Sequence, residues 1–203
     1  MWFVLALCSA LFQVLRNVIM KRLGHELDET INVWGRFTFI LPFAAVPLVV
    51  NGLPPIDNSI WLASIFFALS QIIATLSLSK ALKDSDISLV TPLWKLSVLF
   101  LMVWGFFALD ERPTGLGLAG ILVLVAGVYV INVERARVSL WAPLSALVTD
   151  PGQRWTLLSA FFFAPAVVFV KQMALASNPV FAIFLGYVMC SVLVTPYAVY
   201  RSA

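Results

Sequence analysis

Lys95 is the residue that most needs a chemical explanation, because it stands inside the apolar run PLWKLSVLF at 92–100. It falls nine residues into a helix predicted over 86–109. At 1.5 Å per residue that is roughly 13 Å, close to the middle of a bilayer. A lysine at that depth costs about 2.5–3.5 kcal/mol to insert. Every Asp and Glu lies in a loop or at a predicted helix end, so no carboxylate within a helix can pair with Lys95.

Three kinds of partner remain open for Lys95. Pro92 frees the backbone carbonyl of Ser88, and this or a nearby carbonyl would accept a hydrogen bond from the ammonium. An acid in further helices of a longer protein is the second kind, and a substrate with an anionic or carbonyl group is the third. Because burying a charge is costly, we expect Lys95 to line a transport cavity.

Polar side chains recur on single faces of the predicted helices. Their spacing is close to i, i+4 and i+7 or i+8, which places side chains on one side of a helix. Because polar groups that face lipid are expensive, these faces should meet one another or a watery cavity. Hydrogen bonding between packed helices explains the serines and threonines as well, and for Gln13, Gln71 and Thr75 both interpretations stay open. The three sets are Ser9, Gln13, Arg16 and Asn17; Ser64, Gln71 and Thr75; and Ser88, Thr91 and Lys95.

Two arginines also fall within predicted helices. Arg16 and Arg36 lie within a few residues of the same basic surface, and long side chains that reach outward explain both without any function. They are candidates for the cavity all the same. The residues that we expect to line a substrate cavity are Lys95, Thr91, Gln13, Gln71, Thr75, Arg16, Asn17 and Arg36.

The composition identifies the solvent that surrounds these helices. The chain is 62% hydrophobic and only 11% charged, whereas a soluble domain carries about 25% charged residues. A spanning helix needs about 20 mostly apolar residues, and only helices or closed barrels satisfy their backbone groups in lipid. The start lacks a basic segment and stays apolar to Met20, which indicates a retained helix instead of a signal peptide. We predict an all-α integral membrane protein with about seven transmembrane helices, near 2–20, 31–51, 59–80, 86–109, 115–132, 154–176 and 178–199.

The basic residues predict an orientation. Cytoplasmic loops carry the Lys and Arg excess, so we expect the loops at 21–30, 80–86 and 133–153 in the cytoplasm of a bacterial inner membrane, with the N-terminus outside. The loop at 133–153 also contains Val138, Leu140, Trp141 and Leu144, which favour a segment on the membrane surface. The richer side holds Lys21, Arg22, Lys80, Lys83, Arg135, Arg137, Arg154 and Arg201, and the other side holds Arg112 and Lys171.

The sequence restarts after this loop. Trp155 opens a helix as Trp2 does, and the pair Gly186-Tyr187 stands where Gly35-Arg36 stands earlier, at an offset of 150–153 residues. Five helices precede the restart, so the second copy would cross the membrane in the opposite direction, as in the inverted repeats of secondary transporters. We expect a five-helix repeat at 1–132, a loop at 133–153 and two helices of an incomplete second repeat at 154–203, in a fragment that lacks about three helices.

An ordered set of motifs runs through residues 79–132. It comprises Ala81-Leu82, Ser88, Val90, Pro92-Leu93, the turn Asp110-Glu111-Arg112-Pro113-Thr114, Gly120-Ile121 and Gly127-Val128. With the opening MWFVLALCSALFQVLRNVIMKRL, this pattern resembles the EamA-type domain of the drug/metabolite transporter superfamily. The resemblance implies a ten-helix carrier of two inverted repeats that moves small metabolites or drugs by alternating access. It makes Glu111 and Arg112 a structural turn, in which Glu111 faces the N-terminus of the next helix.

Other functions have less support in the residues. An enzyme needs acid–base, nucleophilic or metal-binding groups, but the only histidine, His25, lies in a charged loop, so we expect no enzyme, no metal and no cofactor. Multidrug pumps with a glutamate in their first helix are disfavoured, because this chain has Gln13 and Arg16 there. The alternative that stays open is a non-transporting membrane subunit or assembly protein. The expected partners are the lipid bilayer and a small-molecule solute, with no nucleic acid and with a homodimer left open.

Overall fold

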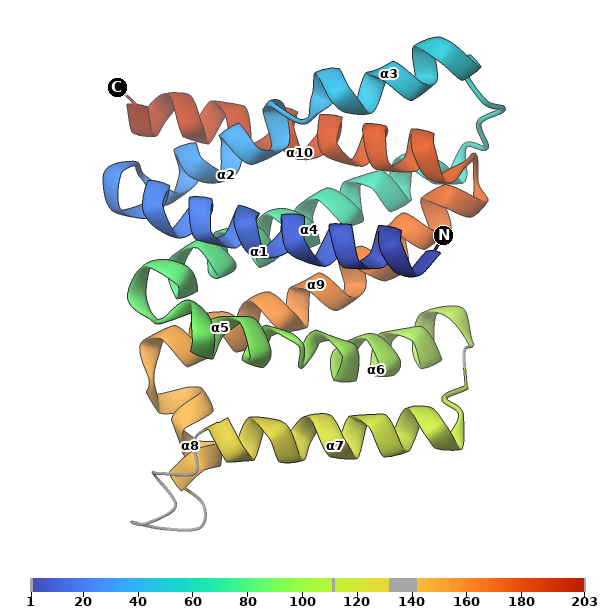
Figure 1. Cartoon of the computed structure of the whole chain (residues 1–203). Helices are drawn as coiled ribbons and strands as arrows, with labels where there is room; N and C mark the ends of the chain where they lie inside the picture. Colours follow the sequence, from blue (N-terminus) through green and yellow to red (C-terminus); the bar gives the residue numbers. More distant parts are fainter. Residues whose placement is uncertain (1, 111, 132–141, 203) are drawn as a thin grey trace.

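The computed structural model describes residues 2–110, 112–131 and 142–202, and the ordered elements in these ranges are all helices. Figure 1 shows them as a bundle of roughly antiparallel rods. The helices are α1 Trp2–Glu26, α2 Glu29–Thr38, α3 Leu41–Asn51, α4 Ser59–Asp84, α5 Ile87–Trp94, α6 Ser97–Leu109, α7 Gly115–Ile131, α8 Ala142–Thr149, α9 Pro151–Leu175 and α10 Pro179–Ser202.

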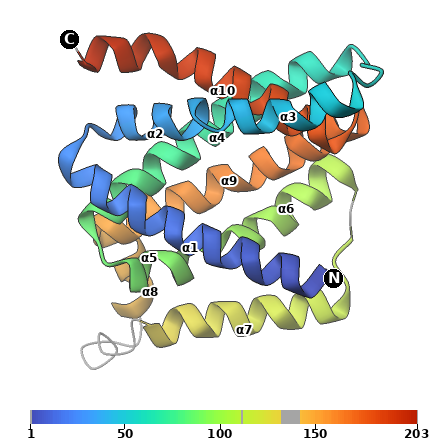
Figure 2. The same cartoon turned by 45° about the horizontal axis from the view of Figure 1, so that its top comes forward.

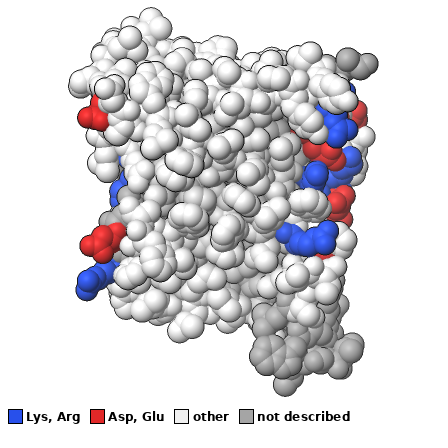
Figure 3. Space-filling model, turned by 180° about the vertical axis from the view of Figure 1, so that it is seen from behind, with Lys and Arg blue, Asp and Glu red and all other residues white. Residues whose placement is uncertain are grey.

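Six segments of the described chain are long and apolar enough to cross a membrane. The helix at Gly115–Val130 is also apolar but shorter. On the face shown in Figure 3, charged side chains gather at the two ends of the molecule and leave an uncharged surface between them. The predicted all-α membrane class is therefore confirmed. The six segments are Phe3–Glu26, Glu29–Val50, Ser59–Asp84, Ile87–Ala108, Pro151–Leu175 and Pro179–Arg201.

Two of these spans are interrupted next to a proline. The second span breaks between α2 and α3, just before Pro42, which cannot donate a backbone hydrogen bond. The fourth breaks at Lys95 and Leu96, where both amides donate at 3.0 Å to carbonyls only three residues back, those of Pro92 and Leu93. This is the tighter 3₁₀ pattern. The sequence predicted unbroken helices in both places, so the structure corrects this detail.

The helices α4 and α9 form the centre of the bundle, and their contact is the most extensive between any two helices. Small residues allow this close approach: Ala68 and Ala74 on α4 and Ala160 and Ala164 on α9 are all at most 2% exposed. Figures 1 and 2 place α2, α3 and α10 on one flank of this pair and α5, α6 and α7 on the other, while α1 crosses in front. The central pair thus separates two groups of helices, and each group packs its own side chains against the pair.

Hydrogen bonds between side chains fix the flank helices to one another. Trp34 on α2 donates from Nε1 to Oγ1 of Thr195 on α10 at 2.9 Å. The hydroxyls of Thr38 and Ser191 meet at 2.8 Å across the same two helices. Within lipid such groups must find partners inside the bundle, so these contacts set the register of α2 against α10.

Ion pairs and a cap order the end of the bundle where α1, α4 and α10 terminate. Lys83 Nζ lies 2.8 Å from Glu29 Oε1, and Lys21 Nζ donates to the Ser85 carbonyl at 2.7 Å. Asp28 caps α2 by accepting from the Thr30 amide at 2.8 Å. Burial disfavours the Asp28 carboxylate, but the hydrogen bonds from Thr30 outweigh it and hold the pKa of Asp28 below its usual value. This end is therefore charged but internally paired.

Some predictions fall on residues that the structure does not describe. Glu111 lies outside the described residues, so its role in the turn stays a prediction. The same holds for residues 132–141, which contain Val138, Leu140 and Trp141 of the expected surface segment. The described part of that loop forms α8 and the first residues of α9. The division into repeats also stays a prediction.

Replacing Gly152 with Ala should destabilise the α4–α9 contact. A Cβ at Gly152 would collide with the Ser85 side chain at the end of α4, and overpacking of this kind costs about 1–3 kcal/mol. We expect a lower midpoint of thermal unfolding in detergent, with recovery when Ser85→Gly is added. The control is Gly127→Ala on α7, where a Cβ meets nothing within 4 Å. Equal stability of the two single variants would contradict the packing described above.

Candidate functional site

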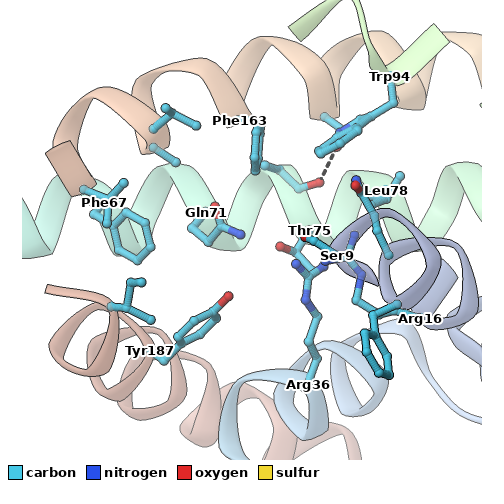
Figure 4. A pocket seen from close by; sticks show the side chains of 18 residues that line it. Ser9, Arg16, Arg36, Phe67, Gln71, Thr75, Leu78, Trp94, Phe163 and Tyr187 are labelled. Atoms are coloured by element: carbon cyan, nitrogen blue, oxygen red, sulfur yellow. Dashed lines mark hydrogen bonds between the residues drawn. The ribbon is translucent and has the colours of Figure 1, made fainter. Parts of the chain in front are cut away.

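A cavity of about 620 Å³ lies between six helices of the bundle. Side chains from α1, α2, α4, α5, α9 and α10 line it, and Figure 4 shows them pointing toward a shared space. Its volume falls in the range of small-molecule sites, about 300–1,000 Å³. The cavity therefore has the size and the position of a solute site within the membrane-spanning part.

Two arginines give this cavity its charge. Arg16 on α1 and Arg36 on α2 both line it. Arg16 donates from Nη2 to Oδ1 of Asn17 at 3.2 Å, while its Nε is buried with no hydrogen-bond partner among the described residues. Arg36 contacts the sulfur of Met20 at 3.8 Å, and Tyr187 lines the same cavity. Both guanidiniums thus rely on neutral neighbours.

Neutral polar groups continue the charged side of the cavity along α4. Gln71 is 6% exposed and Thr75 is 2% exposed, and Gln13 on α1 lies close by in the same lining. Among the described residues, no Asp or Glu lines the cavity, and none forms an ion pair with Arg16 or Arg36. The site therefore offers two cations and several hydrogen-bonding groups without a carboxylate to balance them.

Aromatic rings form another part of the wall. Trp94, the last residue of α5, packs against Phe163 of α9 with ring centroids 4.6 Å apart. The indole N–H of Trp94 donates to Ser159 at 3.0 Å, and the Ser159 hydroxyl donates in turn to the Ala74 carbonyl at 2.7 Å. This chain of hydrogen bonds holds the indole in one orientation, with its ring toward the cavity (Figure 4).

The structure brings five of the eight predicted cavity residues together. Asn17 is buried beside them and hydrogen-bonds Arg16, although it does not line the cavity itself. The sequence did not single out Trp94, Phe163 or Tyr187. For Tyr187 the sequence contains an indication, because Tyr187 corresponds to Arg36 in the proposed repeat. Nothing in the sequence distinguishes the other two from lipid-facing aromatic residues. The five that line the cavity are Gln13, Arg16, Arg36, Gln71 and Thr75.

Lys95 and Thr91 lie elsewhere. Lys95 is exposed at the break between α5 and α6, with Nζ 5.6 Å from the centroid of the Trp94 ring. It lines a second, mostly apolar groove of about 650 Å³ between α6 and α7, which Arg112 also lines. The Thr91 hydroxyl is buried with no hydrogen-bond partner among the described residues. The expected placement of Lys95 in one cavity with the other candidates is thus not what the structure shows.

Comparison with known proteins adds one match. The model of a family described as the EamA-like transporter family matches residues 1–133. No curated protein and no solved structure matches the chain. The matched range contains α1, α2, α4 and α5, which supply both arginines of the cavity and Trp94.

The hydrogen bond between Trp94 and Ser159 can be tested by stability measurements. Ser159→Ala leaves the buried indole N–H without its acceptor, which costs about 1–3 kcal/mol, so the midpoint of thermal unfolding should fall. Adding Trp94→Phe removes the orphaned donor and should recover part of the loss. Ser177→Ala is the matched control, because the Ser177 hydroxyl is buried with no hydrogen-bond partner among the described residues. A loss for Ser159→Ala no larger than for Ser177→Ala would contradict the described anchoring of the indole.

Proposed function

Because the chain belongs to the EamA-like transporter family, we propose that it carries a small solute across the membrane by alternating access, with the cavity between α1, α2, α4, α5, α9 and α10 as the solute site. The membership and the six apolar spans make it a multi-pass membrane protein of the drug/metabolite transporter type. The observation that carries the choice of site is the pair Arg16 and Arg36. Cations within the membrane are expensive and mark substrate pathways.

The same pair favours an anionic or carbonyl-bearing solute. Arg16 and Arg36 line one cavity without a carboxylate of the described residues, so their charges repel each other. An anion between them offsets both charges, and the planar guanidinium fork suits carboxylate and phosphate oxygens. A cationic solute would add a third positive charge. The cavity therefore favours anions over cations.

The two interrupted spans support alternating access. Arg36 lies on α2 two residues before its end, and Trp94 is the last residue of α5. Both cavity residues thus adjoin a break, where backbone hydrogen bonding is least regular. Discontinuous helices beside the solute site recur among secondary transporters, and residues at the ends of elements absorb the angle changes of domain motions. Bending at these breaks is our proposal for opening the cavity to either side.

The paired charged end supports a direction in the membrane. Lys21, Lys83 and Arg201 lie at the end of the bundle where Asp28 and Ser85 also lie. Because cytoplasmic loops carry an excess of basic residues, we propose that this end lies in the cytoplasm. We also propose that the membrane is a bacterial inner membrane. The alternative function is that of a membrane subunit or assembly protein that moves no solute.

Substitution of either arginine should reduce transport of anions. Losing a charged hydrogen bond costs about 1.5–3 kcal/mol, so Arg16→Met and Arg36→Met should each slow uptake at least about tenfold. The measurement is uptake into proteoliposomes of radiolabelled succinate, phosphate and 4-hydroxybenzoate, with methyl viologen as the cation. Arg22→Met is the matched control, since Arg22 lies on α1 like Arg16 but is exposed and outside the cavity. Uptake of every probe equal to that of empty liposomes would favour the non-transporting subunit.

Alternating access predicts that the cavity opens to both sides in turn. With Cys8 and Cys190 replaced by serine, Val167→Cys places one thiol at a half-buried position of the cavity lining. A membrane-impermeant maleimide should label it from either side, and a transported solute should change the two rates in opposite directions. Leu122→Cys on the exposed surface of α7 should stay unlabelled because it faces lipid. Labelling of position 167 from one side only, under all conditions, would contradict the mechanism.

A further inference from the structure

The cavity is divided into a cationic side and an aromatic side. In Figure 4, Arg16 and Arg36 extend from α1 and α2, while Trp94 and Phe163 lie across the space from them. Gln71 and Thr75 of α4 lie between the two sides. A solute that spans the cavity therefore meets charge at one end and rings at the other.

We propose that this cavity binds aromatic acids, with the acid group on Arg16 and Arg36 and the ring against Trp94 and Phe163. The inference rests on the proposed function in that it concerns the same cavity, and it adds the class of solute. Binding of an aromatic acid requires both sides of the cavity at once. A small aliphatic anion would use only the arginines, and a neutral aromatic compound would use only the rings.

The acid group is specified by what the arginines lack. The Nε of Arg16 is buried without a hydrogen-bond partner among the described residues. The ring of Phe37 lies 5.8 Å from the guanidinium carbon of Arg36, which is a weak contact. Asn17 supplies a neutral oxygen to Arg16, and Met20 supplies a neutral sulfur to Arg36. An anionic oxygen is a stronger acceptor than either of these, so an acid gains at this end what a neutral solute does not.

The ring is specified by how Trp94 is held. Its N–H is already engaged by Ser159, so the indole offers the solute a ring surface and no donor. Phe163 lies at 55° to it with centroids 4.6 Å apart, and Phe67 and Tyr187 also line the cavity. Aromatic pairs prefer such tilted or offset arrangements and gain beyond the area that they bury. An added planar ring continues this cluster.

The absence of carboxylates from the lining of the described residues separates acids from amines. An ammonium group would share the cavity with Arg16 and Arg36 and find no Asp or Glu there. Aromatic amines should therefore be excluded, and an aromatic amino acid should bind less tightly than the same acid without its amino group. This order distinguishes an acid site from a general aromatic site.

The test is a binding measurement that needs no transport. Isothermal titration calorimetry on the purified full chain in nanodiscs would compare 4-hydroxybenzoate with cyclohexanecarboxylate, phenol, tyramine and phenyl phosphate. We expect 4-hydroxybenzoate and phenyl phosphate to bind at least about tenfold more tightly than the other three compounds. Cyclohexanecarboxylate lacks the aromatic ring, and phenol and tyramine lack the negative charge. The relative affinity of phenyl phosphate then tells whether a carboxylate or a phosphate is the preferred acid. Tyramine or cyclohexanecarboxylate binding as tightly as 4-hydroxybenzoate, or no binding of either acid, would overturn the proposal.

Variants separate the two halves of the site. Arg36→Met should weaken 4-hydroxybenzoate at least about tenfold and leave phenol almost unchanged, whereas Phe163→Leu should weaken 4-hydroxybenzoate more than cyclohexanecarboxylate. Arg36→Lys keeps the charge and should retain part of the affinity, which guards against misfolding as the cause. Arg22→Met should bind like the unaltered chain. Aromatic acids that bind as described but are never moved into liposomes would defeat the proposed carrier and leave this site standing.

Discussion

A bilayer core offers no water to polar groups, and this one constraint arranges the whole molecule. Backbone groups satisfy one another within helices, and polar side chains must turn toward the bundle. The close contact of α4 and α9 makes this arrangement workable, because small residues such as Ala68 and Ala164 bring the two helices together. The hydroxyl of Ser159 on α9 then reaches the Ala74 carbonyl on α4 at 2.7 Å.

The same constraint explains why the cavity is a site and not a packing defect. An empty apolar space would need no polar lining, yet Gln71 and Thr75 are buried on its wall and two arginines extend into it. Their partners are a methionine sulfur and an asparagine oxygen. Such groups keep the guanidiniums in place without neutralising them. The cavity without solute thus retains an unbalanced positive charge. An anionic solute therefore binds the guanidiniums more strongly than the neutral side chains of the helices do.

The sequence predicted the class of fold and most of the polar cavity, because both follow from spacing. Runs of apolar residues fix the spans, and Gln13 and Arg16 share a face that cannot turn to lipid at low cost. Lys95 was harder, since its place along the helix gives its depth in the membrane and not the direction of its side chain. That direction depends on the break after Trp94, where the amides of Lys95 and Leu96 bond three residues back. Trp94 and Phe163 were missed because the sequence pattern around an aromatic residue is the same whether its ring faces lipid or a cavity.

The pair Arg36 and Tyr187 links the cavity to the proposed repeat. In the repeat that the sequence predicts, the two residues would occupy equivalent positions, and both line the cavity. Elements related by a two-fold axis bring equivalent positions together where the axis passes, so a meeting at the cavity is what an inverted repeat predicts. The two positions differ in chemistry, however, with a guanidinium on α2 and a phenol on α10. A strictly symmetric cavity would hold a solute equally well in two directions, whereas the arginines of α1 and α2 on one side and the rings of Trp94 and Phe163 on the other give the solute an acid end and a ring end.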